Sequence, residues 1–151
     1  MRKFCRRKKA CLDENFGFNV LEPNNQPESA RQVIWIGQST LLVSIDGMYI
    51  LTDPVLSDRA SPFSFAGSKR VTPPALTAEQ MRELTAILIS INHYDHLDLP
   101  SLTKLAKHQP ETLFLVPLGL KSLLNDNGIT NVVELDWWQQ TKIGEATFTA
   151  T

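Results

Sequence analysis

Short apolar runs alternate with polar, turn-forming segments along most of this chain. Residues 40–45 and 48–52 are rich in strand-forming side chains, and only an Asp-Gly pair separates them. Such a pair suits a type I′ turn, whose two central residues both need positive φ, so the pattern predicts a β-hairpin. A further β-rich run at 31–36 precedes the hairpin and ends at Gly37. We therefore expect the ordered domain to begin near residue 31.

The pattern after the hairpin alternates between helical and strand-like segments. Helices are predicted at 77–84, 99–108 and 120–128. Their end signals are a capping box of Thr77 and Gln80, an N-cap at Asp98 and a C-terminal Gly128. Short buried strands are predicted at 86–91 and 112–117, and further strands at 131–135 and 146–151. A β-hairpin followed by alternating helices and strands defines an α/β protein. The polar loop 53–75 is long enough to be functional or disordered.

Basic residues are concentrated at the N-terminus. Six of the 15 lysines and arginines lie in the first nine positions, which leaves 9 basic against 16 acidic residues, a net charge of −7, for residues 11–151. We interpret residues 1–30 as a basic, mobile head with a linker, and residues 31–151 as the domain. Weak attachment of the head to anionic lipid is the alternative interpretation. Nucleic-acid binding is disfavoured because no aromatic residues interleave with the basic ones.

The remaining composition indicates a protein of the ordinary globular class, with 42% hydrophobic and 21% charged residues. No apolar segment of a secretory signal follows the basic head, and none reaches the ~20 residues of a membrane span. Cys5 and Cys11 form no CxxC pair and are expected to be free thiols in a reducing compartment. We therefore expect a cytoplasmic protein, with a peripheral position at the inner membrane surface as the alternative.

A polar cluster follows the predicted strand 86–91. It contains His93, Asp95 and His96, and ligand sites in open α/β sheets collect at the carboxyl ends of strands. Imidazole and carboxylate groups are ligands that suit Zn²⁺. On an extended backbone the three side chains fit one tetrahedral ion poorly, but they could serve two adjacent ions. An exposed polar turn that binds no metal is the alternative.

Two other candidate chemistries receive less support from the sequence. His108 ends a predicted helix, and we expect it to interact with the last carbonyl groups of that helix. A Ser-His-Asp hydrolase is disfavoured because the chain contains no GxSxG nucleophile elbow.

Five segments of the chain, in register, resemble one known family. They are WIGQSTLLVSIDGMYILTDPVLSDRASP, GSKRVTPPAL, ILISINHYDHLDLPSL, LFLVPLGLKSLL and NVVELDWWQQ. The third segment is similar to the HxHxDH signature of the metallo-β-lactamase superfamily. Together the five resemble the bacterial relatives of N-acyl-phosphatidylethanolamine-hydrolysing phospholipase D. The resemblance runs from about residue 31 to residue 151 and implies the N-terminal half of an αββα sandwich.

Members of the resembled family are zinc-dependent hydrolases with a dinuclear site. By position, the resemblance implies that His93 is a ligand of the first Zn²⁺ and that Asp95 and His96 are ligands of the second. It also implies that Asp95 orients or deprotonates the attacking water, and that Asp53 at most fixes a loop or acts behind the ligands. The implied substrates are phospholipids or other phosphodiesters.

The sequence departs from the family at several metal-binding positions. Ile91 stands where HxHxDH has its first histidine, and Gln38 replaces the histidine of the family's WIGHST segment. Segments that match the family's second half, with its remaining ligands, do not follow. We therefore expect a truncated member with an incomplete zinc site. The alternatives are one half of a split enzyme that needs a separate C-terminal fragment, and a non-catalytic lipid- or protein-binding remnant. Uncovered strands also predict self-association.

Overall fold

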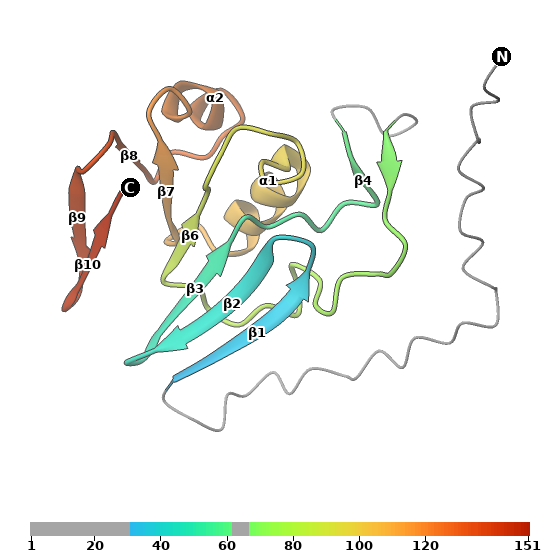
Figure 1. Ribbon diagram of the computed structural model, residues 1–151, viewed down its shortest axis with the longest axis horizontal. Coiled ribbons are helices and arrows are strands. Elements are labelled where there is room, and N and C mark those ends of the chain that lie inside the picture. Colours follow the sequence, from blue (N-terminus) through green and yellow to red (C-terminus); the bar gives the residue numbers. More distant parts are fainter. Residues whose placement is uncertain (1–30, 62–66) are drawn as a thin grey trace, which may run out of the picture.

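The computed structural model describes residues 31–61 and 67–151, which are built around one central sheet (Figure 1). The interpretation of residues 1–30 as head and linker lies outside the described residues. The sheet contains β1 (Arg31–Gly37), β2 (Thr40–Ile45), β3 (Met48–Thr52), β6 (Ala86–Leu88), β7 (Leu113–Pro117) and β8 (Val132–Leu135). The strand order is β1-β2-β3-β6-β7-β8, with antiparallel pairing from β1 to β3 and parallel pairing from β3 to β8.

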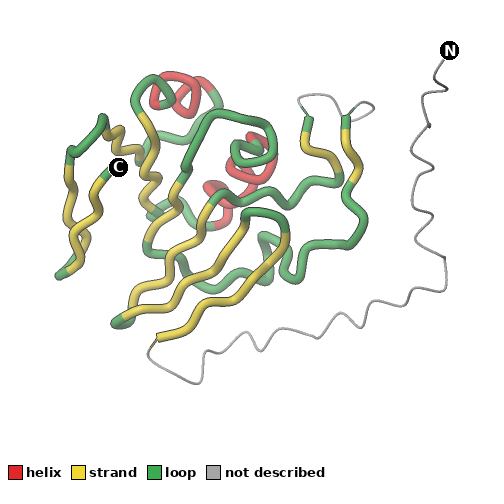
Figure 2. Tube along the Cα trace, viewed as in Figure 1, coloured by secondary structure: helices red, strands yellow, loops and turns green. Residues whose placement is uncertain are grey.

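Two helices pack on one face of the sheet, α1 (Leu99–His108) and α2 (Lys121–Asp126) (Figure 2). They contribute Leu102, Leu105 and Leu124, all fully buried, to a single apolar cluster. The sheet contributes side chains from four neighbouring strands to the same cluster: Leu42, Leu51, Ile87 and Phe114. This core holds the strand ends of the parallel half in place. The combination of a mixed sheet with helices on one face confirms the α/β prediction.

The opposite face of the sheet is also apolar, and we call it the open face. Strand register places its members on the same side of the sheet: Val33, Trp35, Leu41, Val43, Ile45, Ile50, Leu88, Leu115 and Val133. Ile50 and Leu115 at its centre are buried, but Val33 and Trp35 at the β1 edge are 62% and 65% exposed. The sheet therefore presents a largely apolar surface opposite the helices.

The predicted hairpin is confirmed, because Asp46 and Gly47 between β2 and β3 both have positive φ, at 49° and 81°. The helix at 99–108 is confirmed with its predicted bounds and with Pro100 in its first turn. Gly128, with φ of 81°, follows the end of α2 as expected of a C-terminal glycine.

The side chains at the two ends of α1 have partners in other segments of the chain. The Asp98 side chain occupies the N-cap position but makes no capping hydrogen bond. It accepts hydrogen bonds from the backbone N–H and hydroxyl of Ser57, both at 3.0 Å, and from the Ser101 hydroxyl at 2.5 Å. The His108 side chain lies in the last turn of α1 with its Nε2 3.7 Å from Glu79 Oε1, and its expected interaction with the last carbonyl groups of the helix stays a prediction.

The segment 77–84 forms a single turn and not the predicted helix. The capping interaction exists, because Thr77 N–H donates to Gln80 Oε1 at 2.9 Å. The helix does not continue because the backbone N–H of Leu84 donates to Gln109 Oε1 at 2.7 Å. A tertiary hydrogen bond therefore replaces the helical one at this position.

The strand predicted at 146–151 is present as β10 (Ala146–Thr149), but several strand boundaries and two strand pairings were not predicted. β6 ends at Leu88 and not at residue 91, because the Ser90 N–H bonds to the Asp53 carboxylate. The loop 53–75 contains a small antiparallel pair, β4 (Arg59–Ala60) and β5 (Ser68–Lys69). β9 (Gln140–Ile143) pairs with β10 (Ala146–Thr149) in a separate two-stranded sheet.

The start of α2 is fixed by a carboxylate from the neighbouring strand. Glu134 accepts hydrogen bonds from the N–H groups of Gly119 at 2.7 Å and Lys121 at 2.9 Å. The hydrogen bond from the Lys121 backbone is the main reason why the pKa of Glu134 lies below its usual value.

Among the described helices, none has the length and apolar character needed to cross a membrane.

Candidate functional site

The three predicted site residues lie in the tight turn that connects β6 to α1. The backbone carbonyl of His93 accepts hydrogen bonds from the N–H groups of His96 at 2.9 Å and Leu97 at 2.6 Å. His93 and Asp95 are exposed, whereas His96 is partly buried. The turn also contacts the loop between β1 and β2, because the Ser39 hydroxyl donates to the Asp95 carbonyl at 3.0 Å. The structure thus brings all three residues to the carboxyl end of a central strand.

Asp53, directly after β3, fixes the orientation of His96. Asp53 is 6% exposed, and its carboxylate accepts hydrogen bonds from Ser90 N–H and Ser90 Oγ–H, both at 2.7 Å. His96 Nδ1 lies 2.9 Å from Asp53 Oδ2, so this ring nitrogen carries the proton that the carboxylate accepts. The lone pair of neutral His96 is therefore on Nε2, which lies 3.8 Å from Asp95 Oδ2.

Ser90, His96 and Asp53 lie close together but do not form a nucleophilic triad. Ser90 Oγ donates to Asp53, and both groups approach the same imidazole nitrogen, Nδ1. A triad needs the serine and the carboxylate on opposite nitrogens of the ring, so that the imidazole can accept the serine proton. Ser90 therefore has a structural role, as a bridge between β6 and the Asp53 carboxylate.

A metal centre is implied by the resemblance, but the described residues do not complete one. Within 31–61 and 67–151, no three side chains of His, Cys, Asp or Glu gather as a group that could hold a metal ion. His96 Nε2 and Asp95 Oδ2 form a pair of metal donors, and Ile91, which precedes them in the chain, is 40% exposed and supplies none. The described donor set thus does not fit a complete zinc site, and the assignment of His93, Asp95 and His96 as ligands stays a prediction.

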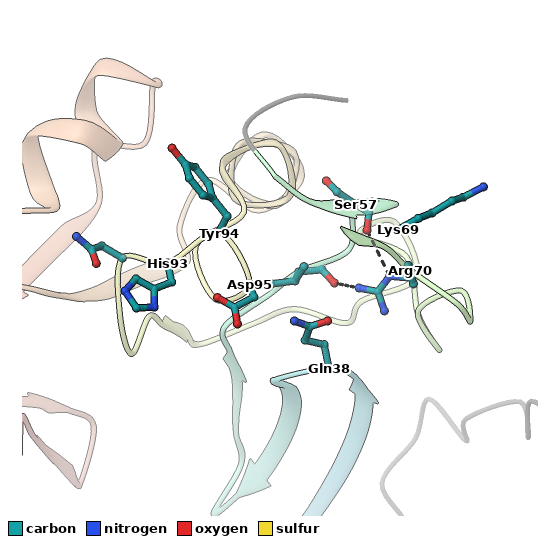
Figure 3. A pocket seen from close by; sticks show the side chains of 9 residues that line it. Gln38, Ser57, Lys69, Arg70, His93, Tyr94 and Asp95 are labelled. Atoms are coloured by element: carbon teal, nitrogen blue, oxygen red, sulfur yellow. Dashed lines mark hydrogen bonds between the residues drawn. The ribbon is translucent and has the colours of Figure 1, made fainter. Parts of the chain in front are cut away.

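A cavity of about 530 Å³ lies beside this turn (Figure 3). Its lining comes from the β1–β2 turn, the loop after β3, the end of β5 and the 92–95 turn: Gln38, Val55, Ser57, Lys69, Arg70, Asn92, His93, Tyr94 and Asp95. Arg70 Nε donates to the Ser57 carbonyl at 3.3 Å, and Arg70 Nη2 donates to the Val55 carbonyl. These hydrogen bonds therefore fix the loop after β3, which forms part of the cavity wall.

The electrostatics of Arg70 are unusual for an arginine. Burial lowers the pKa of its guanidinium, and the nearby charges of Asp98 and Asp58 offset that effect only in part. Neither Arg70 nor Ser90 was predicted from the sequence to have a role. Arg70 lies in the GSKRVTPPAL segment that carried the resemblance, which was the available signal, whereas nothing in the pattern distinguished Ser90.

Comparison with known proteins relates most of the chain to one family. The family described as "Beta-lactamase superfamily domain" matches residues 48–151. N-acyl-phosphatidylethanolamine-hydrolyzing phospholipase D 1 of Caenorhabditis elegans is 36% identical over 129 residues, which cover 82% of this chain and 36% of the relative. The mitochondrial N-acyl-phosphatidylethanolamine-hydrolyzing phospholipase D of Saccharomyces cerevisiae is 37% identical, with 87% of this chain and 28% of the relative covered. The chain thus spans about a third of the length of these relatives.

Solved structures of related fold agree with this placement. CmlA, a diiron β-hydroxylase from Streptomyces venezuelae, superposes with a TM-score of 0.59 at 26% identity, over 81% of this chain and 23% of that chain. An isothiocyanate hydrolase from Delia radicum gut bacteria gives a TM-score of 0.58 at 18% identity, over 75% of this chain and 44% of that chain. The second likeness concerns the fold alone. From the family match, the relatives and the fold, the chain belongs to the metallo-β-lactamase superfamily.

Proposed function

We propose that this chain carries part of the catalytic centre of a zinc-dependent hydrolase that cleaves a phosphodiester bond in N-acyl-phosphatidylethanolamine or a related phospholipid. Two relatives bear that activity in their names, at 36% and 37% identity. The supporting observation in the structure is the 2.9 Å hydrogen bond between Asp53 and His96. A carboxylate on one imidazole nitrogen fixes the ring and leaves the other nitrogen available, which is the usual arrangement behind a metal-binding histidine.

The residues of this chain have distinct roles in the proposal. Asp53 orients His96, and the half-exposed Asp95 orients or deprotonates the attacking water. His93 lines the cavity next to Asp95, where a substrate would enter. Because the described residues lack a complete donor set, we propose that a separate C-terminal fragment supplies the remaining ligands. The chain alone is then expected to be inactive.

Metal content is the first test of this proposal. Zinc and iron per chain are measured by elemental analysis of the purified protein and of a His93→Ala/His96→Ala variant. Iron is included because one neighbour of this fold is a diiron enzyme. We expect little metal on the isolated chain, and stoichiometric zinc once a fragment covering the remaining length of the Caenorhabditis elegans relative is added. The double variant should remain metal-free in both conditions.

Hydrolysis is measured in the same mixture with vesicles that contain N-acyl-phosphatidylethanolamine. The proposal expects release of the phosphatidic acid product by the mixture and loss of that activity with Asp95→Asn. A folded mixture that binds no metal and releases no product would contradict it.

A second candidate is a non-catalytic module that binds lipid or protein. It is favoured by two observations: residues 31–61 and 67–151 contain no complete metal-donor set, and the apolar Ile91 immediately precedes the site turn. Lipid binding through the basic head would place the protein at an anionic cytoplasmic membrane surface. This candidate predicts binding to anionic vesicles that weakens with salt, is unchanged by a chelator, and is accompanied by no hydrolysis in the mixture.

A further inference from the structure

The cavity beside His93 and Asp95 carries an excess of positive charge. Its charged lining residues are Lys69 and Arg70 on one side and Asp95 on the other. The short β4–β5 pair brings the two cations to this place, since Arg70 directly follows β5 and its N–H donates to the Asp58 carbonyl at 2.7 Å. Residues from distant parts of the chain thus form one polar cavity with two cations.

The Arg70 guanidinium is fixed in its orientation. Its Nε and Nη2 atoms donate to the carbonyls of Ser57 and Val55. Its Nη1 atom lies 2.9 Å from the position that a Cβ on residue 37 would occupy, so a side chain at Gly37 would displace the guanidinium. Within the described part of the chain, Nη1 has no hydrogen-bond acceptor. A preorganised donor therefore remains available at the cavity wall.

The positive charge of Arg70 is incompletely balanced by the protein. Asp98 is near but already accepts hydrogen bonds from Ser57 and Ser101, and it makes none with Arg70. The pKa of Arg70 is lowered because loss of hydration outweighs the attraction of Asp98 and Asp58. An anion at the guanidinium would compensate for this loss through charge-assisted hydrogen bonds.

Lys69 differs from Arg70 in mobility. Its side chain is exposed, and its ammonium group extends away from the cavity toward solvent, as Figure 3 shows. An ammonium on a flexible four-carbon stem acts as a point charge that can move toward an anion. The two cations can therefore act together, one as a fixed fork and one as a mobile charge.

We propose that this cavity is a subsite that binds a phosphate group, with Arg70 as the fixed donor and Lys69 as the mobile counter-charge. The assignment of that phosphate to the substrate rests on the proposed function. The phosphate could belong to a lipid headgroup or be free phosphate, because both present a tetrahedral oxyanion.

The test uses the full chain in the presence of a chelator, so that bound metal plays no part. Inorganic phosphate and glycerophosphoethanolamine are titrated separately, and binding is followed by the NMR signals of Arg70 Nε–H and of the amides of residues 92–95. The variants are Lys69→Gln, Arg70→Lys and, as a matched control, Lys142→Gln, which removes an exposed lysine on β9.

We expect saturable binding of at least one of the two probes. Arg70→Lys should weaken it by about tenfold, since it keeps the charge but loses the planar fork. Lys69→Gln should weaken it about threefold, an effect that shrinks at high salt because this cation is exposed. Lys142→Gln should bind as the unmodified chain does. Tighter binding of glycerophosphoethanolamine would identify a headgroup subsite, and tighter binding of inorganic phosphate a site for the free anion.

Equal binding by the unmodified chain and Lys69→Gln would overturn the role of Lys69 as a counter-charge. Non-saturating shifts spread over distant lysines would overturn the subsite as a whole. Lys69→Gln removes no hydrogen bond of the fold, so its result stands even if Arg70→Lys does not fold. Hydrolysis in the mixed sample without phosphate binding in chelator would refute the subsite alone. Phosphate binding without hydrolysis would refute the proposed function alone.

Discussion

Asp53 connects the hairpin half of the sheet to the candidate site. It follows β3, donates its own N–H to the Leu88 carbonyl at 2.8 Å, and accepts hydrogen bonds from Ser90 and His96. Its φ of 39° is uncommon for a residue other than glycine, and the surrounding hydrogen bonds hold it there. One buried side chain therefore determines both where β6 ends and how His96 is oriented.

Replacing Asp53 with Asn should reverse the tautomer of His96. The amide NH₂ would face the Nδ1–H of His96 as a second donor, so the ring should move its proton to Nε2. We also expect a loss of about 1–3 kcal/mol in the free energy of unfolding, because the hydrogen bonds that Ser90 and His96 make with a charged carboxylate are lost or weakened. Nitrogen-15 NMR of His96 and urea unfolding measure the two effects. Asp126→Asn, at an exposed position on α2, is the control; an unchanged His96 tautomer in Asp53→Asn would contradict the assignment.

Glu79 gives a prediction for the pH dependence of stability. Lys104 Nζ lies 2.6 Å from Glu79 Oε1. This hydrogen-bonded ion pair is the main reason why the pKa of Glu79 falls from 4.5 to about 2. A carboxyl whose pKa is lower in the folded state stabilises that state above its unfolded pKa, and the contribution disappears as the pH falls through the folded value. Glu79→Gln should therefore lower the melting temperature slightly at pH 7, and the difference should shrink between pH 4.5 and about 2. A difference that is constant over this range would refute the assignment.

Single residues of the site were predictable only where a motif names them. His93, Asp95 and His96 follow from their spacing and from the resemblance. The role of Arg70 depends on two carbonyl groups that lie 13 and 15 positions earlier in the chain, and no local pattern encodes such contacts. The contact between His108 and Glu79 was not predictable for the same reason, because Glu79 lies in another segment of the chain.

At the scale of elements, α1 depends on its buried leucines. Leu102 is fully buried between the helix and the sheet, so Leu102→Ala should lower the free energy of unfolding by about 2–5 kcal/mol. Leu123→Ala on α2 is the matched control, because Leu123 is 36% exposed and should lose about 0.5 kcal/mol or less. Urea unfolding of both variants measures the effect. Equal losses in the two variants would show that α1 does not pack as described.

Elements were predictable where local rules act without competition. The Asp-Gly hairpin and the 99–108 helix follow from turn chemistry and periodicity, and the structure confirms both. The segment 77–84 has a valid capping signal, but Gln109 takes the N–H of Leu84 from outside. The strand at 86–91 is shortened because the Asp53 carboxylate takes the N–H of Ser90. Both errors arise from long-range hydrogen bonds to side chains that the local pattern does not reveal.

At the scale of the whole molecule, the open face is the dominant surface feature. Val33 and Trp35 at its edge remain largely exposed, on the side of the sheet opposite the helices. Contiguous apolar surface of this kind promotes association. The exposed apolar side chains of the open face are the physical basis for the self-association expected from the sequence, which stays a prediction.

Changing Val33 to Thr together with Trp35 to Gln should weaken self-association. Removing this apolar area should raise the dissociation constant of the associated species about tenfold or more, because each 1.4 kcal/mol of lost burial is tenfold. Analytical ultracentrifugation over a range of concentrations measures the constant. Val71→Thr, which alters an exposed valine outside the open face, is the control. If the double variant associates as strongly as the control, the open face is not the contact surface.

The Asp46-Gly47 turn has a further consequence, for the chemical ageing of the protein. Aspartate before glycine forms a cyclic succinimide readily, because glycine offers no side chain to hinder attack by its nitrogen, and the ring reopens mainly to isoaspartate. Isoaspartate would add one main-chain atom to a two-residue turn whose geometry sets the register of β2 and β3. It would also displace the carboxylate that lies 3.2 Å from Arg31. Stored protein should therefore accumulate a species of unchanged mass and altered retention time, with its modification in the turn before β3, at the opposite end of that strand from Asp53.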